Sequence, residues 1–92
     1  MRKSASIYRF PPNRRAERLS LTEQVYYIEG ELKEVKQAIL LCEGDARIIE
    51  ELWDVAQTIE GALRKFPIHK VVVGFVRVLL KSRKRGDYRK AA

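Results

Sequence analysis

Two pairs of acidic residues with the same spacing are the part of this 92-residue chain whose residue types could do chemistry. Glu31 and Glu34 are three residues apart, and Glu51 and Asp54 repeat that spacing further along the chain. Carboxylates that lie close together repel one another unless protons or cations come between them. Oxygen ligands without supporting His or Cys suit hard cations, so the pattern predicts a site for Mg²⁺ or Mn²⁺.

The same spacing also has an ordinary structural interpretation. Acidic residues three apart on a helix are common on solvated faces, and Lys33 and Lys36 are close enough in sequence to pair with them. A second acidic pair beside an apolar stripe raises the weight of the metal site until it equals that of this alternative. From the residues alone, both interpretations stay open.

Two amphipathic helices should position the four carboxylates. Ser20 precedes Glu23 by three residues, which is the spacing of a capping box at a helix start. Apolar residues then recur every three or four positions up to Gly44, which predicts a helix of about 22 residues. Its expected core stripe is Val25, Ile28, Leu32, Val35, Ile39 and Cys42. Tyr27 falls on the same face as the two glutamates and is a candidate for contact with a nucleobase.

A second helix should follow, with Asp45 as a possible cap and Pro67 as its end. Its expected apolar stripe is Ile48, Leu52, Val55, Ile59, Ala62, Leu63 and Phe66. The short link predicts an antiparallel hairpin, in which the two acidic pairs can face each other across a cleft.

The third element, residues 68–82, is rich in valine, and its β-branched residues alone would favour a strand. A lone strand would have no partner here, so we expect a third helix. A hairpin cannot cover an element that is apolar on nearly all sides, which predicts self-association. The predicted fold is therefore all-α: an antiparallel helical hairpin plus a third helix, assembling into a helical bundle through oligomerisation.

Charge divides the chain into three parts. Residues 1–18 and residues 81–92 each hold six Lys/Arg and one acid, whereas the middle of the chain is net acidic. We expect a basic, extended arm over 1–18 that contains Pro11-Pro12, a helical domain over 19–82, and a basic tail over 83–92. Basic ends suit an anionic partner such as nucleic acid or nucleotide phosphates, or they are solvated tails.

Two further features of the sequence bear on the cellular compartment of the protein and on whether it contacts a membrane. The single Cys42 and the lack of an apolar leader are typical of a cytoplasmic protein. The apolar run from Ile68 to Leu80 is interrupted by Lys70 and Arg77. It is too short and too charged to span a bilayer, so no membrane partner is expected.

The acidic motif resembles a known family. Glu31-x-x-Glu34, a spacer and then Glu51-Leu52-Trp53-Asp54 is similar to the motif of the MazG-like, all-α nucleoside triphosphate pyrophosphatases. The phrase "EELWDVAQT" resembles the small phage and Gram-positive members in particular, and "KSRKRGDY" resembles the ending of that family's last helix. The resemblance runs roughly from Tyr27 to Tyr88.

The resemblance implies Mg²⁺-dependent hydrolysis of a nucleoside triphosphate, (d)NTP, to (d)NMP and pyrophosphate. It implies that Glu31, Glu34, Glu51 and Asp54 hold the metal, and that one of them orients or deprotonates the attacking water. It further implies a homodimer or homotetramer with sites built partly across subunits.

The third helix is involved in one implication of the resemblance and in one difference from the family. By the resemblance, Lys81 and Arg85 would reach the substrate phosphates. Family members usually have a more polar third helix, whereas Val71 to Leu80 is almost wholly apolar here, which suggests burial in a subunit interface. The competing hypothesis is a non-catalytic helical oligomer on the same scaffold that binds nucleic acid through its basic ends or acts as a regulator.

Overall fold

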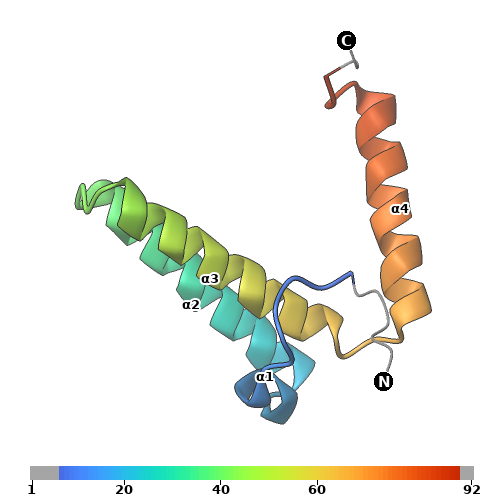
Figure 1. Ribbon diagram of the computed structural model, residues 1–92, viewed down its shortest axis with the longest axis horizontal. Coiled ribbons are helices and arrows are strands. Elements are labelled where there is room, and N and C mark those ends of the chain that lie inside the picture. The colour runs from blue at the N-terminus through green and yellow to red at the C-terminus, as the bar shows by residue number, and fades with distance from the viewer. Residues whose placement is uncertain (1–6, 90–92) are drawn as a thin grey trace, which may run out of the picture.

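The computed structural model describes residues 7–89, and within this range the chain forms helices and no strand. In chain order the helices are α1 (Arg14–Arg18), α2 (Leu21–Leu40), α3 (Asp45–Leu63) and α4 (Ile68–Arg85), shown in Figure 1. The all-α prediction is therefore confirmed for these residues. Residues 1–6 of the expected arm and 90–92 of the expected tail lie outside the described part of the chain.

An antiparallel hairpin of α2 and α3 is the main packing unit, and the two helices lie side by side in Figure 1. The predicted capping box is present at its start. The Ser20 hydroxyl accepts a hydrogen bond from the Glu23 amide, and the Glu23 carboxylate accepts one from the Ser20 amide. At the turn Gly44, with φ of 98°, takes the N-cap position of α3, so the expectation that Asp45 caps this helix is wrong.

The face of α2 that meets α3 differs from the predicted stripe. Val25, Leu32 and Ile39 are each about half exposed, whereas Gln24, Val35 and Ala38 are buried. The buried set repeats at helical spacing through Glu31, so the contact face is rotated toward the glutamates. The small Ala38 side chain allows close approach of α3. Of the predicted stripe, Val35 is buried, whereas the bulkier Leu32 and Ile39 are left at the surface.

The arm predicted as extended contains a helix, because Asn13 caps α1. Its side-chain oxygen accepts a hydrogen bond from the Ala16 amide at 3.1 Å. The α1 helix lies on α3. Just beyond the end of α3, the Lys65 ammonium donates to the Ala16 carbonyl at 2.7 Å and also to the Leu19 carbonyl. Residues 9 and 10 are fixed to the same helix, because the Glu60 carboxylate accepts hydrogen bonds from both of their amides.

We expect Gly61→Ala to destabilise the protein by about 1–3 kcal/mol, because it overpacks the contact between α1 and α3. A Cβ at Gly61 would lie 2.8 Å from the Ala16 Cβ and 2.9 Å from the Gln24 amide nitrogen. The matched control is Gly30→Ala, where a Cβ meets nothing within 4 Å. That change should stabilise α2 by up to about 1 kcal/mol. Chemical denaturation of both variants tests the contact, and equal stabilisation by both would contradict it.

The fourth helix stands apart from the hairpin in Figure 1 and has at most marginal contact with the other helices. It begins after Pro67 and ends at Gly86, which adopts a left-handed conformation with φ of 78°. The predicted third helix is thus confirmed, and it extends three residues beyond Ser82 into the segment predicted as a tail. Within residues 7–89, none of the helices has the length and apolar character needed to cross a bilayer.

The fold described for residues 7–89 is more open than a compact domain. Its radius of gyration is 15.9 Å, whereas about 12 Å is typical for a compact domain of this length. Many large apolar side chains are exposed on α4, among them Val72, Val73, Phe75, Val76, Val78 and Leu80.

Candidate functional site

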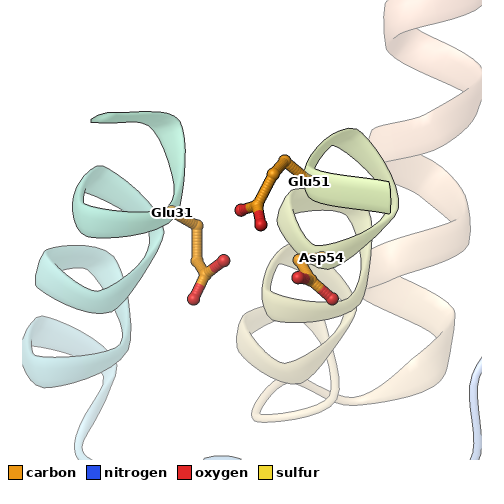
Figure 2. A group of neighbouring side chains, drawn as sticks. All are labelled: Glu31, Glu51 and Asp54. Carbon is orange, nitrogen blue, oxygen red and sulfur yellow. The ribbon is translucent and has the colours of Figure 1, made fainter. Parts of the chain in front are cut away.

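Three of the four predicted carboxylates converge between α2 and α3. Glu31 comes from α2, and Glu51 and Asp54 come from α3; Figure 2 shows their carboxyl groups pointing toward one another. One oxygen of each can be chosen so that all three lie within 4.8 Å of one another. Glu51 is only 2% exposed, and the other two are half-buried. We call these three residues the carboxylate cluster.

Two oxygens of the carboxylate cluster have no hydrogen-bond partner. Oε2 of Glu31 and Oε2 of Glu51 are both buried and unpaired. A buried charge without a partner is costly and is usually compensated by a proton, an opposite charge or a metal. These oxygens are therefore groups that a bound cation would satisfy.

The electrostatics of the carboxylate cluster agree with this geometry. Burial raises the pKa of Glu31, and the nearby Glu34 and Asp54 carboxylates raise it further, while Tyr27 and Arg15 oppose the shift. Burial also raises the pKa of Glu51, the neighbouring Glu34 and Asp54 carboxylates raise it further, and Arg47 opposes the shift. Glu34 is exposed, but it lies close enough to act on both, so it stands at the edge of the cluster.

Arg47 supplies partial compensation from the solvent side. Its guanidinium pairs with Glu51 at 2.7 Å, with Glu50 at 2.9 Å and with Glu43 at 3.7 Å. The Arg47 contact reaches Oε1 of Glu51 and leaves Oε2 unpaired. Because one arginine is shared among three carboxylates, it does not neutralise the carboxylate cluster.

The residues present fit a hard divalent cation. All three candidate ligands are carboxylates, and Mg²⁺ and Mn²⁺ prefer oxygen ligands. The two unpaired oxygens come from different helices, so a cation there would link α2 to α3.

A polar cavity of about 350 Å³ adjoins the carboxylate cluster, and Glu31 and Asp54 form part of its wall. Other lining residues come from α2, from α3 and from residues 7–19, which we call the N-terminal segment. Among them are Asn13, Arg15, Gln24, Tyr27 and Thr58. The volume lies at the lower end of the range for small-molecule sites. Tyr27, predicted as a candidate base contact, therefore lies in a cavity beside the carboxylates.

The two cations predicted to reach the phosphates lie elsewhere in the chain. Lys81 and Arg85 are on the last turns of α4, which stands apart from the hairpin (Figure 1). Arg85 is paired with Asp87 at 2.8 Å. Within one chain, the structure does not bring either residue to the carboxylate cluster.

Several residues of the cavity were missed from the sequence, and Gln24 and Arg15 are the two whose chemistry bears most on binding. Gln24 lies seven residues before Glu31 and thus on the same face of α2, so its position was a usable signal. Arg15 lies in a helix of five residues, which is too short to show any hydrophobic period. Its only sequence signal is Asn13, a good N-cap residue that directly follows Pro12.

Comparison with models of protein families, with curated proteins and with solved structures finds no match for this chain.

Proposed function

We propose that the protein is a metal-dependent nucleoside triphosphate pyrophosphatase that hydrolyses (d)NTP to (d)NMP and pyrophosphate. The observation that carries the proposal is the carboxylate cluster with its two buried, unpaired oxygens. The similarity of the acidic motif to that of the MazG-like pyrophosphatases supports the same class. Mg²⁺ or Mn²⁺ is the proposed cofactor.

Glu31, Glu51 and Asp54 would hold the cation, with Glu34 beside them. A divalent cation bound there supplies charge neutralisation for the triphosphate, which is the main requirement of such hydrolysis. Glu34 is exposed and is close enough to act on the pKa of both Glu31 and Glu51, but it is not one of the three converging ligands. In this proposal Glu34 orients the attacking water and accepts its proton.

Assembly into a homodimer or homotetramer is part of the proposal. The chain exposes 8119 Å² of surface, whereas a compact monomer of this mass exposes about 5,500 Å². The excess of exposed surface over that of a compact monomer is well above the ~800 Å² per partner that a standard interface buries. In such an assembly, α4 of a second copy is the element that would bring Lys81 and Arg85 to the carboxylates.

A second candidate function rests on the end of α4. Lys81, Arg83 and Lys84 are all exposed there, which suits contact with a nucleic-acid backbone. A non-catalytic or regulatory oligomer would then keep the acidic cluster as structure only. Tight binding to long DNA or RNA that falls steeply with salt, without nucleotide hydrolysis, would favour this alternative.

The test is pyrophosphate release from a panel of ribo- and deoxynucleoside triphosphates, with and without Mg²⁺ or Mn²⁺. We expect turnover only with a divalent cation. Asp54→Asn should lower kcat by about 10²–10³-fold, because it weakens the hold on the cation that would stabilise transition-state charge. The control Glu29→Gln removes an exposed carboxylate from α2 and should leave turnover within about twofold. The absence of pyrophosphate release from every nucleotide in either cation would refute the proposal.

A further inference from the structure

The N-terminal segment, to which the sequence assigned no part in the site, forms one wall of the cavity beside the carboxylate cluster. Asn13, Arg15, Ala16 and Leu19 all line that cavity. The segment is held in place rather than loosely attached. Ala16 is buried, its carbonyl accepts a hydrogen bond from Lys65, and its Cβ lies against Gly61.

Arg15 extends from α1 to Tyr27 of α2 and lines the same cavity as Glu31 and Asp54. Its guanidinium carbon is 5.2 Å from the centre of the Tyr27 ring, and its Nη1 donates a hydrogen bond to the Tyr27 hydroxyl. Tyr27 and Arg15 both act on the Glu31 carboxyl. A guanidinium carries five N–H donors in a fork that matches phosphate, so donors remain after the bond to Tyr27.

Three other described cations near the hairpin are already engaged. Arg47 is shared among three carboxylates, Arg64 donates to the Phe10 carbonyl, and Lys65 donates to two carbonyls of the N-terminal segment. Among the residues that line the cavity, Arg15 is the one with a positive charge.

Gln24 supplies an independent sign that the cavity is built for a ligand. It is 2% exposed, and its amide nitrogen donates to the Thr58 carbonyl at 2.9 Å. That bond fixes which end of the amide carries the oxygen, because an amide oxygen has no hydrogen to donate to the Thr58 carbonyl. The Gln24 oxygen has no partner, although buried polar atoms are normally paired. It therefore lacks an N–H or O–H donor.

We infer that this cavity is the nucleotide pocket, in which Arg15 binds the phosphates next to the carboxylate cluster and the nucleoside occupies the end near Gln24. The inference rests on the proposed function for the class of substrate. A base or sugar carries the N–H and O–H donors that the Gln24 oxygen lacks, whereas an ionised polyphosphate carries none.

The test is calorimetric titration with the α,β-methylene analogues of the four common deoxynucleoside triphosphates, and with inorganic tripolyphosphate, in the presence of Mg²⁺. Arg15→Gln should weaken binding of the analogues by about tenfold or more, as expected for loss of a charge-assisted contact. Arg15→Lys keeps the charge and should restore part of the affinity. The control is Arg14→Gln, which removes the same charge from the neighbouring position, outside the cavity, and should change affinity by less than about twofold.

The outcomes separate this inference from the proposed function. Equal effects of Arg15→Gln and Arg14→Gln would overturn the role of Arg15. Tripolyphosphate that binds as tightly as every analogue would overturn the placement of the nucleoside. Binding that depends on Arg15, in a protein that releases no pyrophosphate from natural nucleotides, would uphold the pocket and refute the enzyme. If the wild-type chain binds none of the probes, both proposals fail. Thermal melting of each variant shows that it is folded.

Discussion

Replacing Glu31 by glutamine should raise the melting temperature of the metal-free protein at pH 8. The pKa of Glu31 is raised by burial and by the neighbouring carboxylates, so its ionised form is disfavoured in the folded state. For such a group the folded chain binds more protons than the unfolded chain. Stability is then highest below the ordinary pKa of a glutamate and falls as pH rises through the raised value. Glutamine does not ionise, so the variant does not lose stability as the pH rises through this range.

The size of the expected rise is several degrees, since about 1 kcal/mol corresponds to about 4–8 °C for a domain of this length. Melting should be followed from pH 4 to pH 8 in the presence of a chelator, and the variant should depend less on pH than the wild type. Glu29→Gln is the control on the same helix, because Glu29 is exposed and outside the carboxylate cluster. A variant that melts at or below the wild-type temperature at pH 8 would mean that the carboxylates do not repel one another.

Addition of Mg²⁺ or Mn²⁺ should make the wild type melt at a higher temperature than the Glu31→Gln variant. A ligand that binds only the folded chain stabilises it, so the wild type should gain melting temperature with millimolar cation. The Glu31→Gln variant should gain little, because one of the two unpaired oxygens is gone. Glu31 should therefore lower the stability of the metal-free protein and raise the stability of the cation-bound protein. This is the behaviour expected of a ligand in a cation site made of like charges.

The second large effect is expected on α4. Val76 is 44% exposed in a helix that has almost no packing within its own chain. If this surface is buried between copies, Val76→Glu places an unpaired charge in an apolar interface, which is strongly unfavourable. We expect sedimentation at micromolar concentration to show a smaller species, or an unfolded chain, in place of the wild-type assembly.

The control for assembly is His69→Glu, which adds the same charge at an exposed position in the first turn of α4, where the helix dipole favours it. This variant should keep the wild-type mass. A wild-type chain that sediments as a well-folded monomer of 10.7 kDa would contradict the proposed assembly.

The sequence predicts α2, α3 and α4 because their ends and their apolar periods depend on local spacing. Ser20, Gly44 and Pro67 mark the ends of elements, and the three-residue spacing of Glu51 and Asp54 places both on one side of α3. The third helix follows from the lack of a strand partner, although its valines favour a strand. These arguments need no knowledge of which surfaces pack.

The packing face of α2 could not be predicted in the same way. Two neighbouring faces of this helix are partly apolar, and the period of 3.6 residues does not choose between them. Contact between α2 and α3 is decided by the small Ala38 and the hydrogen bond of Gln24 to Thr58, which is a contact between distant parts of the sequence.

The position of Arg15 beside Tyr27 could not be predicted from the sequence for a related reason. It depends on the contact of Ala16 with Gly61 and on the bonds of Lys65 to the N-terminal segment, and none of these leaves a pattern in the sequence. The motif resemblance placed the phosphate-binding cations on the last helix instead. Within one chain that helix stands apart from the carboxylates.

Titration of Mn²⁺ into the wild-type protein, followed by electron paramagnetic resonance of the free ion, tests the central claim most directly. If the carboxylate cluster is a cation site, the signal of free Mn²⁺ should be reduced in a saturable way, Mg²⁺ should compete, and Glu31→Gln should abolish most of the binding. A free-ion signal that equals the added Mn²⁺ up to millimolar concentration would contradict the account. In that case the three converging carboxylates would be a structural feature without a bound metal.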